Sequence, residues 1–452
     1  MFPAPPPGQT GHSEPRIMHH GPIRRNPGAA WTRCTPLACY TTEMKLLALT
    51  YGTEGDTRPL AMLCRGLIDA GHDVTLLAER RTLASAQARG VPSEALEGDI
   101  HEDVVSLLSQ GNSPWAARRG LSRMAHRHTD SWMRQTDAAA ADCDAVLAGG
   151  LAAFVGMSVA EHRGVPLIGT GMIPLTPTRA FPSPFLPQVW TPAVLNRASY
   201  RLVNQQVWHA FRAPINAARA AVLGRGPQRT PWRDVPMLYG ISPALLPTPT
   251  DWPADHLSCG QWRAPDASAW SPDAALQAFL AAGPPPVFVG FGSMTGFDRQ
   301  AVLGALLRML AGRRVLLSPG WAGVPEALAA TLPATVHSVG AVPHEALFPR
   351  CSLVIHHGGS GTTHSACRAG VPSMVMPFAA DQFFWARRLQ RRGVAPAPLS
   401  PRRLDARGLA AALAVAEAPA TRARAAALGA AMAREDGVAT GVAVIEALLG
   451  QR

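Results

Sequence analysis

One stretch of the chain, residues 356–382, combines the residue types that bind phosphate groups and sugars. It opens with HHGGSGTT (356–363) and closes with Asp381-Gln382. An apolar run, SLVI (352–355), precedes it, so we expect a strand, a glycine-rich turn and then a helix. Such a turn points backbone N–H groups and the positive end of a helix at one place, which suits an anion and above all a phosphate.

The glycine-rich turn offers several donors to such an anion. Gly359 and Gly361 let the backbone approach closely. Thr362 and Thr363 are expected to cap the helix and to offer their hydroxyl groups, and His357 adds another donor. A plain helix start with glycines for the turn would look the same, so this motif alone leaves both interpretations open.

Asp381 and Gln382 follow the next predicted strand, PSMVMPF (372–378). The carboxyl ends of neighbouring parallel strands line one crevice. A carboxylate and an amide placed there can hold the hydroxyl groups of a sugar by several hydrogen bonds. The alternative is that Asp381 is an ordinary capping residue of a helix.

A third polar motif, GTEGDTRP (52–59), follows the first predicted strand, Met44–Thr50. We expect a helix from Pro59 to Ala70, with Asp56 in the turn before it and facing a cleft. A carboxylate in that position can act as a general base towards a hydroxyl group. Capping of the helix by Asp56 is the alternative.

The remaining pattern places these motifs in an α/β fold. Short apolar runs alternate with helical patterns, first up to about residue 171 and again from residue 286, which predicts two doubly wound Rossmann-like domains that face a central cleft. The further expected strands are 73–79, 144–150, 165–171, 286–292, 314–320, 334–340 and 352–358. A loop-like stretch, 262–286, is expected to link the domains.

Composition excludes several classes of protein. The chain has 452 residues, 47% apolar and 16% charged, as in globular proteins, and no apolar run is long enough to cross a membrane. The net charge of +11 comes almost entirely from scattered arginines, without a nucleic-acid-binding motif, so we expect no nucleic-acid partner. Seven cysteines without a CxxC pair argue against disulfides and structural zinc, and favour a cytoplasmic protein.

Residues 176–229 interrupt the α/β rhythm. FPSPFLP (181–187) is extended, and 189–223 carry apolar residues at helical spacing with arginines among them. One interpretation is a pair of surface helices. The other is a basic amphipathic surface that meets lipid, at the inner face of a membrane, or an apolar acceptor.

Four stretches together resemble the family 1 glycosyltransferases with the GT-B fold. They are residues 50–79, VFVGFGSM (287–294), the segment from FPSPFLP to residue 216, and 356–382. The likeness is greatest to the glycopeptide and rhamnolipid glycosyltransferases and to the sterol glucosyltransferases, and it extends from Met44 to the mid-390s.

The resemblance implies an inverting, metal-independent hexosyltransferase without a cofactor. The donor would be UDP-glucose, or a dTDP-deoxysugar as the second choice, and the acceptor a lipophilic hydroxyl compound. It implies residues 44–265 as the acceptor-binding domain, 266–435 as the donor-binding domain and 436–452 as a C-terminal helix, after a disordered extension or mis-assigned start at 1–43.

The resemblance also assigns roles to single residues. Asp56 would be the catalytic base, and Asp381 and Gln382 would bind the donor sugar. The backbone near Val342 would meet the nucleobase. The diphosphate would be held by Ser293, His357, Gly359, Gly361, Thr362 and Thr363.

Other functions fit the motifs less well. A dinucleotide-dependent oxidoreductase would use Glu79 as its ribose-binding acid, but GTEGD lacks the GxGxxG pattern. A nucleotide-sugar epimerase would not need the 176–229 insertion, and a non-catalytic sugar-nucleotide-binding partner would not need Asp56. Asp142-Cys143-Asp144 imitates a metal site but leads into a strand, and His126 and His128 are expected on a solvated helix face.

Overall fold

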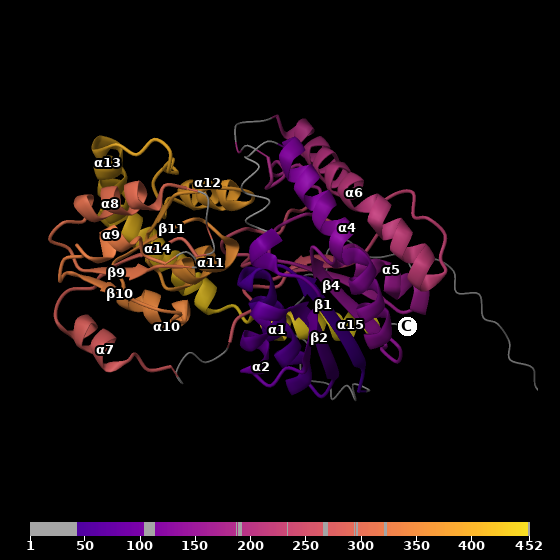
Figure 1. The fold of residues 1–452 in the computed structure, drawn as a ribbon. Helices are drawn as coiled ribbons and strands as arrows, with labels where there is room; N and C mark the ends of the chain where they lie inside the picture. The colour runs from indigo at the N-terminus through magenta and orange to yellow at the C-terminus, as the bar shows by residue number, and fades with distance from the viewer. Residues whose placement is uncertain are drawn as a thin grey trace, which may run out of the picture. The chain divides into compact units, whose positions relative to one another are not determined.

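Buried apolar strands build two parallel sheets in this computed structural model (Figure 1). The structure describes residues 43–103, 114–186, 188, 192–232, 234–264, 270–292, 294, 297–320 and 323–450, and everything below concerns these. Residues Glu43–Arg452 form one compact unit. Residues 1–42 of the extension predicted at 1–43 lie outside the described residues.

The first sheet contains seven parallel strands among the described residues, in the order β3-β2-β1-β4-β5-β6-β7. Because β1 pairs with both β2 and β4, the chain reverses its winding direction at the β1/β4 boundary, where open α/β sheets bind ligands. The strands are β1 (Lys45–Tyr51), β2 (Asp73–Glu79), β3 (Ser93–Leu96), β4 (Ala145–Gly150), β5 (Leu167–Gly171), β6 (Met237–Tyr239) and β7 (His256–Ser258).

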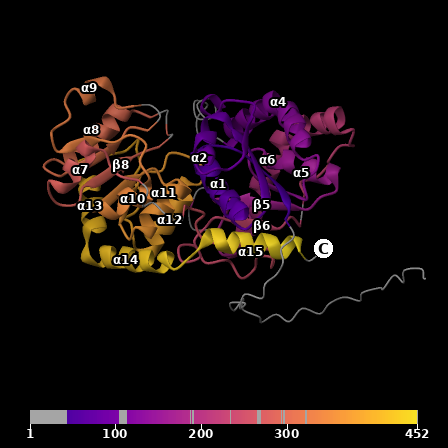
Figure 2. The same cartoon turned by 90° about the horizontal axis from the view of Figure 1, so that it is seen from below.

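Helices cover this sheet on both faces (Figure 2). They are α1 (Glu54–Asp69), α2 (Leu83–Gln87), α4 (Pro114–Ala139), α5 (Ala153–Arg163) and α6 (Ala193–Leu223), with a 3-10 turn at Arg80–Thr82. The predicted strands 44–50, 73–79, 144–150 and 165–171 are confirmed as β1, β2, β4 and β5.

The second sheet repeats the winding with five described strands in the order β10-β9-β8-β11-β12. The strands are β8 (Val287–Gly290), β9 (Val315–Ser318), β10 (Val336–Ser338), β11 (Leu353–His356) and β12 (Ser373–Val375). The helices are α7 (Ala274–Ala281), α8 (Arg299–Met309), α9 (Glu326–Ala329), α10 (His344–Leu347), α11 (Ser360–Arg368), α12 (Gln382–Arg392), α13 (Ala406–Glu417) and α14 (Pro419–Ala433), with a 3-10 turn at Phe348–Arg350. All five strands were predicted.

The last helix, α15 (Gly437–Leu449), returns to the first sheet, whereas α14 stays with the second (Figure 2). Val442 and Ile445 of α15 are buried in one apolar cluster with Leu63 of α1 and with Trp262. Gly66 of α1 allows the close approach, because a Cβ atom there would lie 2.3 Å from Val438. Trp262 is therefore core, and the stretch expected to be a loop-like linker also contains α7.

The predicted start of the first helix at Pro59 is wrong, since α1 begins at Glu54. Thr53 and Asp56 form a reciprocal capping box that starts the helix earlier. Pro59 lies inside the helix, where it gives up one backbone hydrogen bond. Asp56 consequently lies in the first helical turn, not in a turn before the helix.

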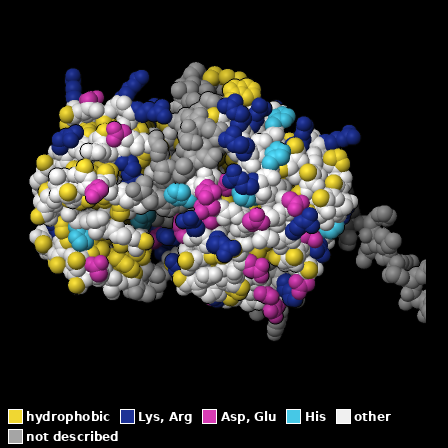
Figure 3. Space-filling view, viewed as in Figure 1, with side chains coloured by type: hydrophobic (Ala, Val, Ile, Leu, Met, Phe, Trp, Pro, Cys, Tyr) yellow, Lys and Arg dark blue, Asp and Glu magenta, His cyan; other side chains and the backbone are white. Residues whose placement is uncertain are grey.

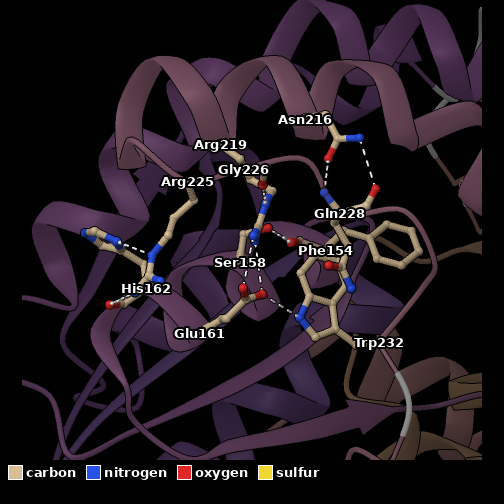
Figure 4. A network of polar contacts seen from close by, with 10 residues as sticks. All are labelled: Phe154, Ser158, Glu161, His162, Asn216, Arg219, Arg225, Gly226, Gln228 and Trp232. Carbon is tan, nitrogen blue, oxygen red and sulfur yellow. Dashed lines mark hydrogen bonds and ion pairs between the residues drawn. The ribbon is translucent and has the colours of Figure 1, made fainter.

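The expected pair of surface helices over residues 189–223 is one helix, α6, which continues through Pro214. Its end is held by a polar network (Figure 4). The buried Arg219 donates to both oxygens of Glu161 on α5, at 3.0 and 3.1 Å, and Trp232 donates to the same carboxylate. The Asn216 side chain accepts a hydrogen bond from the Gln228 backbone N–H, which connects the segment after α6 to the helix.

Two further expectations concern helix α4 and membrane crossing. His126 is exposed, as expected, but His128 is buried and stacks on Trp132 with ring centroids 5.4 Å apart, so the solvated-face interpretation fails for His128. Among the described residues, no helix is both long and apolar enough to span a bilayer.

Candidate active site

A pocket opens where the first sheet reverses its winding direction. Its walls come from the carboxyl ends of three parallel strands and from the first turns of α1, as expected for this topology. The lining residues are Thr50, Asp56, Leu60, Gly149, Gly150, Thr170, Gly171 and Met172.

Asp56 is the only carboxylic acid among the residues that line this pocket. Its Oδ2 atom accepts the Thr53 backbone N–H at 2.9 Å, which fixes the side chain at the helix start. Burial raises the pKa of Asp56 to about 6, against the lowering effect of the hydrogen bonds from Thr53. The side chain is thus ionised at neutral pH but close to its titration point, as a general base requires.

The start of α11 forms the second part of the site. Gly359 is the N-cap, and the Thr363 N–H is the first to bond back, to the Gly359 carbonyl at 3.0 Å. The N–H groups of the first helical turn therefore have no partner within the helix, and the N-cap residue Gly359 supplies no side chain to cap them. Above Gly361 there is open space, because a Cβ atom on this residue would meet no described atom within 4 Å.

Gly358 produces the turn into this helix. It has φ +93°, a conformation that favours glycine, and a Cβ atom there would lie 2.8 Å from Val375 and 3.0 Å from the Gln382 carbonyl oxygen. The sharp turn is therefore specified by the sequence and brings α11 directly to the end of β11.

The expected capping by the two threonines is wrong. Thr362 and Thr363 lie inside α11, after the N-cap Gly359. Thr363 is buried, and its hydroxyl has no hydrogen-bond partner among the described residues. The helix start is thus left to backbone N–H groups, of which that of Thr362 is one.

His357 lies beside the same turn. Its ring is close enough to Gly359 that a Cβ atom there would lie 2.5 Å from Nε2, and Nδ1 has no partner in the described part of the chain. Burial lowers the pKa of His357 to about 4, so the ring is neutral at pH 7 and can donate one hydrogen bond without a positive charge. His356, by contrast, is fully buried and accepts the Gly358 N–H at Nδ1.

Asp381 precedes α12 at the N-cap position, yet its side chain makes no capping hydrogen bond. Instead, its Oδ2 atom accepts the indole N–H of Trp385 at 2.9 Å. Burial raises the pKa of Asp381 to about 7, and the charge of Asp56 contributes to this rise. The charge of Asp56 thus acts on Asp381, although Asp56 lies in α1 and Asp381 lies just before α12.

Gln382 is buried, and most of its hydrogen-bonding groups already have partners within the protein. Its Oε1 atom accepts the N–H groups of Phe378 and Ala379, at 2.8 and 3.2 Å, and its Nε2 atom lies 3.0 Å from the sulfur of Met294. Only one amide N–H is left for a ligand.

The remaining predicted site residues are Ser293 and Val342. Ser293 lies outside the described residues. Val342 is partly buried in the segment before α10 and packs on the apolar cluster around Phe288 and Phe348.

Two residues that were not predicted tie α11 to the first sheet. The Ser360 hydroxyl donates to the Met172 carbonyl at 2.8 Å, and Met172 lines the Asp56 pocket. His364 accepts the Ser242 N–H at 3.2 Å. Sequence offered no signal for these contacts, but the spacing of Asp381 and Trp385, four positions apart on a helix, could have indicated their pairing.

Solved structures share this architecture. The glycosyltransferase VinC in complex with dTDP matches with a TM-score of 0.63 at 19% identity, over 90% of this chain and 100% of that one. The calicheamicin glycosyltransferase CalG4 matches with a TM-score of 0.67 at 16% identity, over 90% and 99%. The two parallel-sheet α/β halves therefore have the GT-B fold.

Sequence comparisons define the family. Residues 324–448 match the model of the erythromycin biosynthesis protein CIII-like C-terminal domain. Sterol 3-beta-glucosyltransferase UGT80B1 of Arabidopsis thaliana is 30% identical over 88% of this chain and 67% of its own length. Sterol 3-beta-glucosyltransferase of Aspergillus fumigatus is 29% identical over 94% of this chain.

The chain belongs to the family 1 glycosyltransferases. It spans 31% of the length of the Aspergillus fumigatus relative, so that protein carries much sequence that has no counterpart here.

Proposed function

We propose that this protein transfers a hexose from a nucleoside diphosphate sugar to a hydroxyl group of a lipophilic acceptor. The observation that carries the proposal is the placement of two half-buried carboxylic acids with raised pKa: Asp56 lines the pocket, and the charge of Asp56 contributes to the raised pKa of Asp381, which precedes α12. The names of the sterol glucosyltransferase relatives support glucose and a sterol-like acceptor.

The reaction follows from the placement of these groups. Asp56 takes the proton of the acceptor hydroxyl, whose oxygen then bonds to the anomeric carbon of the donor. The bond from that carbon to the phosphate oxygen breaks on the opposite face, so the configuration inverts. The transition state resembles an oxocarbenium ion, as in glycoside hydrolysis.

The departing diphosphate gains negative charge during this step. The free N–H groups at the start of α11 and the neutral His357 face the place proposed for it, together with Gly359, Gly361 and Thr362. Preorganised donors of this kind stabilise developing charge without a metal ion or a cofactor.

Asp381 would accept hydrogen bonds from the hydroxyl groups of the sugar through its second oxygen, and Gln382 would donate one. The nucleobase would meet the backbone near Val342. UDP-glucose is the leading donor and a dTDP-sugar is the second, the latter supported by the solved dTDP complex of VinC.

The acceptor would approach from the side of the first sheet. We also propose that the protein contacts an anionic membrane surface. Exposed apolar side chains lie at the starts of α4 and α6, and Val194 is 77% exposed. Arginines accompany them, and α6 contains no acidic residue. Figure 3 shows basic and apolar side chains gathered over this end of α4 and α6. The apolar group is Trp115, Val194, Leu195 and Leu202, and the basic group is Arg118, Arg119, Arg123 and Arg201.

Vesicle sedimentation tests the membrane contact. Vesicles of phosphatidylglycerol and phosphatidylcholine should retain the protein, whereas pure phosphatidylcholine vesicles should not, because the arginines require anionic lipid. Val194→Ser with Leu195→Ser should abolish the retention. Val415→Ser, which alters an exposed residue of α13, is the control. Equal retention of all variants would contradict the proposal.

Thermal unfolding with a panel of ligands tests the donor class. UDP, dTDP and their sugar conjugates should raise the melting temperature, and NAD should not, since only a ligand that binds the folded state stabilises it. Transfer to a sterol acceptor is then measured with the donor that binds. Stabilisation without turnover would identify a non-catalytic binding protein, and stabilisation by NAD an oxidoreductase.

A further inference from the structure

The pairing of Asp381 with Trp385 is not explained by the needs of helix α12. An aspartate at an N-cap normally accepts an N–H group of its own helix, but the Asp381 side chain does not. One turn later, the indole N–H of Trp385 reaches back to Oδ2 at 2.9 Å, while the Trp385 backbone N–H bonds to the Asp381 carbonyl at 3.1 Å. The Asp381 carboxylate therefore accepts a hydrogen bond from a side chain and does not cap the backbone of α12.

Trp385 itself is closely packed. It is fully buried, with its ring centroid 5.1 Å from both His364 and Phe384, in edge-to-face contact with each. Its cluster includes Tyr239 at the end of β6, Ile241 just after it, and Ala425 and Met432 from α14. An indole fixed on all sides is a rigid donor, which is what a precisely aimed carboxylate needs.

We propose that Trp385 is a positioning residue for the donor sugar: its indole N–H occupies one oxygen of Asp381 and aims the other at a sugar hydroxyl. This inference rests on the proposed function, in which Asp381 contacts the sugar. Trp385 touches no reacting atom and acts only through Asp381.

The same hydrogen bond has an electrostatic effect. Burial and the charge of Asp56 raise the pKa of Asp381, whereas the bond from Trp385 lowers it. Without this bond, the pKa of Asp381 would rise above about 7, and a larger fraction of the carboxyl groups would be protonated at neutral pH. A protonated Asp381 is a poorer acceptor for a sugar hydroxyl.

Trp385→Phe keeps an aromatic side chain, although a smaller one, and removes the N–H donor. We expect KM for the sugar donor to rise about tenfold, as for the loss of a charge-assisted hydrogen bond. The affinity for UDP alone should not change, and the acid limb of the pH profile should move to higher pH. A purely structural role would lower UDP binding and donor binding together and would leave the pH profile in place.

Trp252→Phe is the matched control. Trp252 is also buried in this cluster, and its indole N–H donates to the Thr176 carbonyl at 3.1 Å, so the variant loses a comparable hydrogen bond away from Asp381. Its donor KM and pH profile should match those of the wild type. If Trp385→Phe behaved like Trp252→Phe, the proposal would be overturned.

A measurement on the unmodified protein covers the case in which Trp385→Phe does not fold. In protein labelled with ¹⁵N-tryptophan, one indole N–H signal should titrate with a midpoint near pH 7, and this titration should vanish in Asp381→Asn. The signal should also respond to UDP-glucose but not to UDP. No titrating indole signal, or an equal response to both ligands, would refute the inference, whereas absent transfer by the wild type would refute the proposed function alone.

Discussion

Capping of the helix by Asp56 does not exclude its proposed role as a general base. Asp56 closes a capping box with Thr53 and also lines the pocket, because one oxygen is enough for the cap. The residue type and its approximate place could be predicted from GTEGD alone. Its helical position could not, because a proline suggests a helix start and the Thr53 cap overrides that signal.

Asp56→Asn should abolish most of the activity while keeping the fold. The amide oxygen can still accept the Thr53 N–H, but it cannot take a proton, so kcat should fall by about 10²–10⁴. In the wild type, activity should begin to fall near pH 7, where Asp381 becomes protonated, and should fall further through about pH 6, where Asp56 does.

The residual activity of Asp56→Asn should keep an acid limb due to Asp381, moved to lower pH because the charge that raises its pKa is gone. The pH dependence of kcat/KM in both proteins checks this, and an unchanged rate for Asp56→Asn would refute the role of the base.

Asp381→Asn should make the protein more stable at alkaline pH and less active. The folded protein raises the pKa of Asp381 to about 7, so the fold favours the neutral acid, and this stability is lost as the pH rises from about 4 to about 7. Removal of the charge should therefore raise the melting temperature at pH 8 and leave it unchanged at pH 4. Melting curves at both pH values measure the difference, and a lower melting temperature at pH 8 would contradict the argument.

At the scale of elements, helix α11 shows what patterns of residues can and cannot predict. The apolar run before it and the glycines in the turn correctly predicted β11, the turn and the helix. The helix start was predicted too late, because Gly359, which offers no side chain, occupies the N-cap instead of a threonine. Capping statistics favour Thr, so they misplace a helix whose start is left uncapped.

Gly361→Ala separates binding from stability at this helix. A methyl group at this position meets no described atom outside its own helix within 4 Å, and alanine in a helix is favoured over glycine by about 1 kcal/mol. We therefore expect equal or higher stability together with weaker UDP binding, since the methyl group enters the space proposed for the diphosphate.

Gly358→Ala is the counterpart to this variant. It should destabilise the protein, because the residue has φ +93° and a Cβ atom would meet Val375. Calorimetric titration with UDP and urea unfolding of both variants test the pair, and full UDP affinity of Gly361→Ala would place the diphosphate elsewhere.

The continuity of helix α6 could not be predicted from local sequence patterns. The helical pattern over residues 189–223 was interpreted as a pair of helices, but the chain forms a single helix of 31 residues, which continues through Pro214. Pro214 and Ile215 are buried, and the C-terminal end is held by the Arg219–Glu161 ion pair (Figure 4). Tertiary packing thus compensates for the hydrogen bond that proline removes, and no local pattern shows that compensation.

At the scale of the whole molecule, the alternation of strands and helices predicts two doubly wound parallel sheets, but it does not predict the path of the last helix. The sequence indicated a helix at the C-terminus and offered no sign of where it packs. Its apolar face, with Val442 and Ile445, fits α1 because Gly66 and Gly441 leave room for close contact. Glu435, just before it, accepts the Ser242 hydroxyl at 2.8 Å.

This return of the chain makes the first sheet depend on the last helix. Ile445→Ala leaves a cavity in a fully buried site between α15 and the first sheet, which should lower the free energy of unfolding by about 2–5 kcal/mol. Ala443→Ser alters an exposed residue of the same helix and should change it by less than about 0.5 kcal/mol. Urea unfolding followed by circular dichroism measures both. UDP should still bind to folded Ile445→Ala with wild-type affinity, because α11 and its turn are built on the second sheet. A loss of UDP affinity as large as the loss of stability would show instead that the two sheets bind the nucleotide as a single unit.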